Sequence, residues 1–154
     1  MSGYIRGIRK YVGHRTVIQC GASVIVENRC GEILLQRRKD NGCWGYAGGS
    51  VEIDERVEDA AARELFEETG LIARKLELFG VFSGKEMHHV YPNGDEVSNV
   101  DVVYVCREYG GDLRANASEV TALQFFPLHG LPAGINPPNR IAIDAYAGAR
   151  RDAP

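Results

Sequence analysis

The chain has 154 residues, of which 44% are hydrophobic and 25% are charged, and its formal net charge is −3. This composition is typical of a globular protein with a substantial core, so we predict a single domain over residues 1–154. The negative charge argues against stable nucleic-acid binding. No apolar run approaches the ~20 residues needed to span a bilayer, which argues against a membrane protein.

Two features of the sequence bear on the cellular compartment. Residues 1–15, an N-terminal extension, are basic but lack the apolar core of a secretory signal. The four cysteines form no C-x-x-C pair and have no histidine at zinc-like spacing, which favours spectator thiols in a reducing compartment. We therefore expect a cytoplasmic protein.

The first third of the chain predicts a helix followed by two strands. Ile5, Ile8 and Val12 recur at helical spacing, so we expect a short helix that docks on the domain rather than a functional arm. Residues 16–27 are apolar and β-branched and are expected to form a strand, and residues 32–38 are expected to return as a second strand after a short turn. Two strands joined by a short turn predict a β-hairpin.

A loop and a second helix are predicted next. The adjacent Gly48 and Gly49 allow the backbone to approach a ligand closely or to bend sharply. Residues 55–69 are rich in Ala, Leu, Glu and Arg and contain no helix breaker. Gly70 stands where a glycine commonly ends a helix.

The second half of the chain predicts three strands and a closing helix. The strands are expected at residues 75–82, 97–108 and 120–127. Residues 84–96 form a polar connection, and its Pro-Asn-Gly-Asp segment predicts a turn at a hairpin tip. The helix is expected over residues 136–150, with prolines at its start, where a helix tolerates them.

Five charged residues in and before the second helix follow a fixed spacing. Between Gly49 and Leu71 the chain fits the pattern G-x5-E-x7-R-E-U-x-E-E-x-G-U, where U is aliphatic. Glu67 lies about 60° to one side of Glu64 on the helix, and Glu68 lies about 40° to the other side. A solvated acidic face is the alternative, but Glu64 and Glu68 would repel each other in a bare helix. A hard cation such as Mg²⁺ prefers carboxylate-rich sites of this kind, which favours a metal site.

This pattern resembles the signature box of the Nudix hydrolases, which cleave diphosphate linkages in nucleoside diphosphate derivatives. The resemblance implies an α/β fold, an α/β/α sandwich with a mixed sheet and a loop–helix–loop catalytic motif, over essentially residues 15–150. It implies a divalent cofactor, Mg²⁺ or Mn²⁺, with ligands at Glu64, Glu67, Glu68 and the backbone carbonyl of Gly49. Catalytic roles are implied for Glu64, Arg63 and Glu67.

The resemblance also assigns roles around the metal. Arg63 is expected to orient the carboxylates through charge-assisted hydrogen bonds, and Glu55 is either a metal ligand or the partner of Arg63. Glu64 is the first candidate for the general base. Because members of the family place the base differently, the alternatives are Glu119, Glu86, Asp95 and Glu96. Asp54 stands where many members have glycine, at a position that shapes the loop.

Outside the box, three residues are candidates for substrate binding. Arg37 and Arg38 end a strand that runs toward the cleft in this fold, and strand alternation should aim one of them inward. A phosphate contact and a surface charge are equally supported for that residue. Tyr91 could stack on a nucleobase, as could Phe82 or His89, and packing of the ring into the core is the alternative.

The sequence therefore predicts a metal-dependent hydrolase that acts by attack of water on phosphorus. Its partner is expected to be a small nucleotide substrate: a nucleoside triphosphate, ADP-ribose, a dinucleoside polyphosphate or a nucleotide sugar. The alternative is a catalytically silent module that binds such a nucleotide without cleaving it. All the box carboxylates are present, which favours the enzyme. The sequence leaves a homodimer open.

Overall fold

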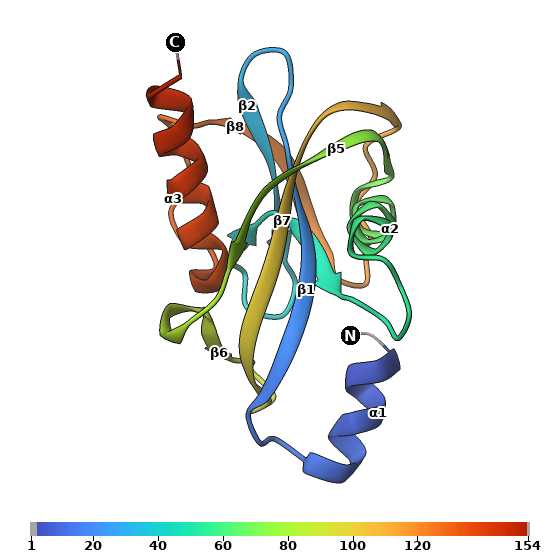
Figure 1. Cartoon of the computed structure of the whole chain (residues 1–154). Coiled ribbons are helices and arrows are strands. Elements are labelled where there is room, and N and C mark those ends of the chain that lie inside the picture. The colour runs from blue at the N-terminus through green and yellow to red at the C-terminus, as the bar shows by residue number, and fades with distance from the viewer. Residues whose placement is uncertain (1–2, 154) are drawn as a thin grey trace.

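Two β-sheets lie at the centre of the structure, a computed structural model that describes residues 3–153 (Figure 1). The larger sheet runs in the strand order β4 (Ala47–Ser50), β1 (Val17–Val26), β7 (Glu96–Gly111) and β5 (Leu71–Phe82), and β6 (His88–Val90) also pairs with β7. The smaller sheet contains β3 (Trp44–Gly45), β2 (Glu32–Arg38) and β8 (Val120–Pro127). The helices are α1 (Gly3–Val12), α2 (Val57–Thr69) and α3 (Pro137–Arg151), with a 3-10 turn, η1, at Lys85–Met87.

The larger sheet is mixed and lies between α2 and α3 (Figure 1), which confirms the predicted α/β/α sandwich. β1 pairs with β7 in parallel, and the other strand pairs of this sheet are antiparallel. Among the described residues, no helix combines the length and the apolar character that crossing a membrane requires.

Alternation along β1 divides the hydrophobic core between the two outer helices. Ala22, Val24 and Val26 belong to a buried cluster that includes Leu65 of α2. Ile25 points to the opposite face and belongs to a second cluster, which includes Ile143 and Tyr146 of α3. Because successive side chains of a strand point to opposite faces, one apolar strand can serve both layers.

The box helix forms as predicted, starting at Val57 rather than at residue 55. Gly70 ends it with a φ of 77°, in the left-handed region, and its N–H donates to the Phe66 carbonyl. Asp54, in the loop before the helix, also has a positive φ of 63°. Aspartate tolerates this backbone conformation better than most residues, which explains why it can stand where many members of the resembled family have glycine.

The predicted hairpin of residues 16–27 and 32–38 is wrong beyond its turn. β1 and β2 enter different sheets, and an isolated bridge between Glu27 and Ile33 is the pairing seen between them in the described chain. Both edges of β1 are already occupied, since β7 pairs along one edge and β4 along the other. The chain therefore crosses to a second sheet, where β2 pairs with β3 and β8.

The elements of the second half match the predictions with shifted ends. The strands predicted at 75–82 and 97–108 extend to Leu71–Phe82 and Glu96–Gly111, and the strand at 120–127 is confirmed. The predicted polar connection contains η1 and β6 as well. Its turn does form a hairpin tip, because the Gly94 N–H donates to the Tyr91 carbonyl between β6 and β7.

The predicted N-terminal helix, α1, is confirmed and docks at both of its ends. At its start, the N–H groups of Gly3 and Tyr4 donate to the carboxylate of Glu52, at 2.9 and 3.2 Å. At its other end, Arg9 donates from Nη2 to the Glu96 carbonyl at 2.6 Å. The helix thus connects the loop before α2 with the β6–β7 hairpin (Figure 1).

Candidate active site

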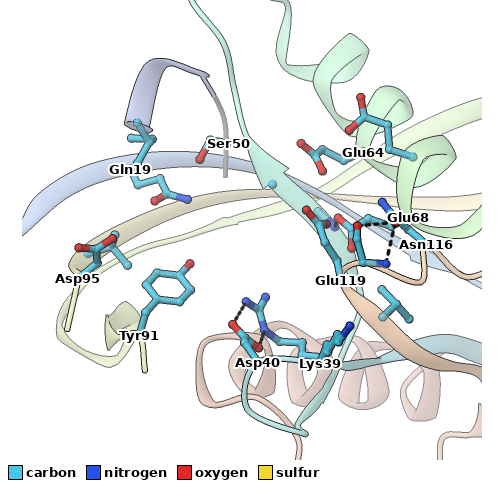
Figure 2. A pocket seen from close by; sticks show the side chains of 18 of the residues that line it. Gln19, Lys39, Asp40, Ser50, Glu64, Glu68, Tyr91, Asp95, Asn116 and Glu119 are labelled. Carbon is cyan, nitrogen blue, oxygen red and sulfur yellow. Dashed lines mark hydrogen bonds and ion pairs between the residues drawn. The ribbon is translucent and has the colours of Figure 1, made fainter. Parts of the chain in front are cut away.

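A cleft of about 780 Å³ opens beside one face of α2 (Figure 2). Its walls come from α1, β1, the loop after β2, β4, the β6–β7 hairpin and the loop before β8. The structure brings five residues of the signature box to this cleft: Gly49, Arg63, Glu64, Glu67 and Glu68. Segments far apart in the sequence therefore meet around the predicted metal site.

Glu64 lies directly against the backbone of Gly49. A Cβ atom on Gly49 would lie under 3.0 Å from the carboxylate carbon and both oxygens of Glu64, so a side chain at position 49 would displace that carboxylate. The position of Gly49 is fixed by the ladder between β4 and β1, where it is paired with Ala22. Glycine is thus required here by a close approach rather than by an unusual φ.

Glu68 is buried, with 5% of its surface exposed. Its Oε2 accepts a hydrogen bond from the Gln36 amide, and its Oε1 accepts from the Gly48 N–H at 3.3 Å. Burial raises the pKa of Glu68 well above its usual value, and the neighbouring charge of Glu64 acts in the same direction. The hydrogen bond from Gln36 opposes this shift without outweighing it.

Arg63 holds the carboxylates of the box in place. Its Nε and Nη2 donate to the two oxygens of Glu55 at 2.7 and 2.9 Å, which is a bidentate pair. Its Nη1 donates to Glu64 at 2.8 Å, and its Nη2 also reaches the Ser50 carbonyl at 3.2 Å. The hydrogen bonds from Arg63 lower the pKa of Glu55, and the same bonds raise the pKa of Arg63. In this structure Glu55 is therefore the partner of Arg63.

Glu67 is the most exposed carboxylate of the three, with 52% of its side chain accessible. Its Oε2 lies 3.4 Å from Nη1 of Arg63. Nη1 of Arg63 therefore links two carboxylates of the helix, the exposed Glu67 and the less exposed Glu64.

The donor set of this wall fits a hard divalent cation. Carboxylate oxygens come from Glu64, Glu67 and Glu68, and in the described part of the chain the buried Oε1 of Gln36, beside Glu68, has no hydrogen-bond partner. Among residues 3–153, no three acidic, histidine or cysteine side chains lie close enough together to bind a metal ion by themselves. An all-oxygen wall of this kind suits a cation such as Mg²⁺, whose coordination is usually completed by phosphate and water oxygens.

Glu68→Gln should raise or preserve the melting temperature of the protein in EDTA. Burial raises the pKa of Glu68 in the folded protein, so its ionised carboxylate is less favourable there than in the unfolded chain. Glu68 therefore contributes to stability below its ordinary pKa of about 4.3, and this contribution is lost as the pH rises through the raised pKa. The mutant should therefore gain about 2 °C or more at pH 8, and the gain should vanish toward pH 4.5. Added Mg²⁺ should stabilise the wild type more than the mutant.

Thermal unfolding in EDTA, followed by circular dichroism at a series of pH values, measures this difference. Glu58→Gln changes an exposed glutamate of the same helix and is the matched control, for which no gain is expected. A Glu68→Gln protein that melts clearly earlier than the wild type at pH 8 would show that Glu68 is a structural partner instead.

Two of the candidate bases face the cleft, and one of them, Glu64, also accepts a hydrogen bond from Arg63 at 2.8 Å. Glu64 and Glu119 both line the cleft, and Glu119 is an exposed residue in the loop before β8. Asp95 also lines the cleft, but its carboxylate is engaged by His14 at 2.7 Å. The other two acids lie outside the lining: Glu96 accepts from Thr16 at 2.7 Å, and Glu86 belongs to η1.

The two arginines at the end of β2 point in different directions. Arg38 lines the cleft, and its guanidinium donates to both oxygens of Asp40 at 2.9 and 2.6 Å. These bonds lower the pKa of Asp40. Arg37 lies outside the lining, and its Nε donates to the Gly42 carbonyl at 3.1 Å. The register shift at this point leaves Thr121 of β8 unpaired, so alternation along β2 continues and Arg38 follows Gln36 on the side of the cleft.

Of the three aromatic candidates, Tyr91 lines the cleft. The guanidinium carbon of Arg38 lies 5.8 Å from the centre of its ring, and the His89 ring meets it edge-on at 4.8 Å. Burial raises the pKa of the Tyr91 hydroxyl. Phe82 packs against the core and stacks on Phe79 at 6.1 Å.

Several residues that shape the site are not in the sequence-based assignment. Gln36 contacts Glu68, the carbonyl of Ser50 accepts from Arg63, and Lys39 and Asn116 line the cleft. Gln36 follows the apolar residues 33–35 and precedes Arg37 and Arg38, so the sequence does not mark it as a buried polar residue. The other three carry no pattern of their own and are placed only by the fold.

A family model described as NUDIX domain matches residues 18–146. The ADP-ribose pyrophosphatase of Methanocaldococcus jannaschii is 39% identical over 104 residues, which are 66% of this chain and 57% of that protein. A putative 8-oxo-dGTP diphosphatase of Bacillus subtilis is 31% identical over 132 residues, or 86% of this chain and 82% of that protein. The chain thus spans little more than half the length of the archaeal relative.

Solved structures share the fold. The crystal structure of a MutT NUDIX hydrolase from Burkholderia pseudomallei superposes with a TM-score of 0.71 at 32% identity. The match covers 83% of this chain and 97% of that one. Sequence and structure comparisons therefore lead to the same domain family as the box pattern does.

Proposed function

The chain belongs to the NUDIX domain family, and from this premise we propose that it is a metal-dependent hydrolase of the diphosphate linkage in a nucleoside diphosphate derivative. One observation carries the proposal, which is the set of groups that meets on one wall of the cleft: Gly49, Glu64, Glu67 and Glu68. Arg38 and Lys39 line the same cleft. It therefore combines oxygen ligands for a cation with positive side chains for phosphate oxygens.

Each residue of the wall has a task in this reaction. The carboxylates of Glu64, Glu67 and Glu68 and the carbonyl of Gly49 would hold Mg²⁺ or Mn²⁺, which neutralises phosphate oxygens and lowers the pKa of water when bound. Arg63 keeps Glu64 and Glu67 in position through its hydrogen bonds.

Proton transfer and bond cleavage follow from the same arrangement. Glu64 or Glu119 accepts a proton from the water that attacks phosphorus. The bond between that phosphorus and the bridging oxygen breaks, and the bridging oxygen leaves on the other phosphate. Lys39 supplies positive charge near the phosphates, which offsets the repulsion between the diphosphate and its nucleophile, whereas the charge of Arg38 is shared with Asp40.

The substrate class rests on the chemistry that the relatives share. One relative is named an ADP-ribose pyrophosphatase and another a putative 8-oxo-dGTP diphosphatase. Both names describe cleavage at a phosphoric anhydride of a nucleotide. We propose this shared class for the present chain, with the cytoplasm as its location, where four free cysteines are in keeping with a reducing environment.

The protein should hydrolyse more than one nucleoside diphosphate derivative and no simple phosphate monoester. The carboxylate wall and its cation recognise the diphosphate, whereas a monoester lacks the bridging oxygen at which the reaction occurs. The test is a panel of nucleoside triphosphates, ADP-ribose, a dinucleoside polyphosphate and a nucleotide sugar, each assayed with Mg²⁺, with Mn²⁺ and with EDTA.

A nucleoside monophosphate is the matched control substrate in this panel. Binding without turnover of any member would favour the alternative function, a nucleotide-binding module. Robust phosphate release from the monophosphate, with no turnover of the diphosphate substrates, would contradict the proposed reaction.

A further inference from the structure

Asp101 is a buried carboxylate that the proposed reaction does not use. It lies on β7 with 7% of its surface exposed, and it is not among the described residues that line the cleft. Its Oδ1 accepts a hydrogen bond from the Ser23 hydroxyl at 2.7 Å, and its Oδ2 accepts one from the Tyr46 hydroxyl at 2.8 Å. Both partners are buried as well. Because a buried carboxylate is unfavourable unless it is hydrogen-bonded, these three residues form one unit, the Asp101 cluster.

Both hydroxyl groups of the Asp101 cluster come from the immediate surroundings of β4. Ser23 lies on β1, where it is paired with Gly48 of β4. A Cβ atom on Gly48 would lie under 3.0 Å from both the hydroxyl oxygen and the Cβ of Ser23, so the backbone of β4 packs directly on this side chain. Tyr46 is the residue that precedes β4. The Asp101 cluster therefore contacts β4 at Gly48 and holds the chain just before its first residue.

The Asp101 cluster also lies next to the carbonyl of Gly49. Gly21 of β1 is paired with Asp101 of β7. A Cβ atom on Gly21 would lie 3.2 Å from Oδ1 of Asp101 and 3.7 Å from the carbonyl oxygen of Gly49. The two oxygens thus lie on the same side of this glycine, which leaves room for both because it has no side chain. The carbonyl that would bind the cation is therefore a close neighbour of the buried carboxylate.

β4 brings two backbone groups to the wall of glutamates. One is the carbonyl of Gly49, and the other is the N–H of Gly48, which donates to Oε1 of Glu68 at 3.3 Å. Two adjacent glycines do not restrict the backbone by themselves. In the described chain, β4 is an end strand of the larger sheet and pairs there with β1. Its position therefore depends on side chains that contact it, and the Asp101 cluster supplies such contacts.

We propose that Asp101 is a positioning residue for the cation, which acts through Ser23 and Tyr46 to fix β4 and with it the Gly49 carbonyl. This inference rests on the proposed function, because it takes that carbonyl to be a ligand. Groups that orient metal ligands from behind commonly change metal affinity or activity by about 10- to 100-fold when they are removed.

The test compares Tyr46→Phe and Asp101→Asn with Tyr146→Phe, the matched control. Tyr46→Phe removes one hydroxyl from Asp101 and keeps the aromatic ring in the core. Tyr146 is likewise a buried tyrosine, and its hydroxyl donates to the buried carboxylate of Glu27, but it lies on α3. All three substitutions therefore disturb a buried, hydrogen-bonded carboxylate, and only the first two do so beside β4. Binding of Mn²⁺ is measured by titration calorimetry without substrate, and the melting temperature is measured in EDTA.

Tyr46→Phe and Asp101→Asn should each bind Mn²⁺ about tenfold more weakly than the wild type, whereas Tyr146→Phe should bind it with wild-type affinity. Each of the three variants should melt at a lower temperature, since each weakens a buried hydrogen bond. A purely structural role predicts lower melting temperatures with unchanged Mn²⁺ affinity, and this result would overturn the inference. An equal loss of affinity in Tyr146→Phe would overturn it too. If Asp101→Asn does not fold, Tyr46→Phe decides, because it leaves the bond from Ser23 in place.

Failure of the proposed function gives a different result, in which the wild type neither binds Mn²⁺ nor hydrolyses a nucleotide. Hydrogen exchange in EDTA, followed by mass spectrometry on peptides that cover residues 44–50, then tests the positioning of β4 by itself. Relative to the rest of the sheet, these amides should exchange about tenfold faster in Tyr46→Phe than in the wild type or in Tyr146→Phe. Equal exchange in the three proteins would contradict a positioning role for the Asp101 cluster.

Discussion

Glu64→Gln and Glu68→Gln are each expected to fold normally and to lose on the order of 10² to 10⁴ in turnover. Both substitutions keep the size of the side chain and remove a negative charge from the wall that would hold the cation. Glu64 touches Gly49 and Arg63, and Glu68 is buried beside Gln36, so neither carboxylate has a nearby substitute of the same geometry.

Steady-state kinetics with saturating Mg²⁺ measure this loss. Glu58→Gln is the matched control, because Glu58 is exposed on the first turn of the same helix, and it should retain wild-type turnover. Activity of either box mutant within about threefold of the wild type would falsify the assignment of the site. Circular dichroism of the mutants separates lost chemistry from lost folding.

Gly49→Ala is expected to reduce turnover by about 10²-fold or more while leaving the fold intact. The new methyl group would occupy the space of the Glu64 carboxylate. That carboxylate is the far end of a flexible side chain, so it can swing away at little expense in stability. A displacement of about 1 Å in a catalytic group can lower a rate 10²-fold, which is why activity should suffer more than stability.

Gly7→Ala provides the control for this substitution. Gly7 lies in the interior of α1, and a Cβ atom there would meet nothing within 4 Å. Alanine is the better helix former, so this variant should be slightly more stable and fully active. If Gly49→Ala keeps wild-type kinetics and its stabilisation by Mg²⁺, then the contact between Gly49 and Glu64 does not matter for catalysis.

The box helix and its carboxylates could be predicted because their geometry is local. Glu64, Glu67 and Glu68 share a face through the helical repeat alone, and Gly70 ends the helix through its backbone freedom. The pairing of Arg63 with Glu55 was one of the two predicted roles of Glu55. The two residues are only eight positions apart, on the helix and on the loop directly before it.

Other parts of the site depend on long-range packing that sequence patterns do not record. Gln36 lies on β2, in the smaller sheet, and contacts Glu68 on α2. Both edges of β1 are paired with other strands, so β2 pairs in the second sheet instead of with β1. Which of Arg37 and Arg38 faces the cleft follows from the side on which Gln36 lies, and that side is fixed by the packing of β2 rather than by a pattern in the sequence. The helix α1 could be predicted, but its place at the cleft depends on the contacts of Glu52.

Phosphorus NMR of the wild-type reaction in water enriched in ¹⁸O tests the central claim most directly. The account predicts that a nucleoside diphosphate derivative is cleaved only when Mg²⁺ or Mn²⁺ is present, and that one ¹⁸O atom appears on a product phosphate that had belonged to the diphosphate bridge. Cleavage that continues in EDTA, or products in which no phosphate carries the isotope, would contradict the attack of water on phosphorus at this site.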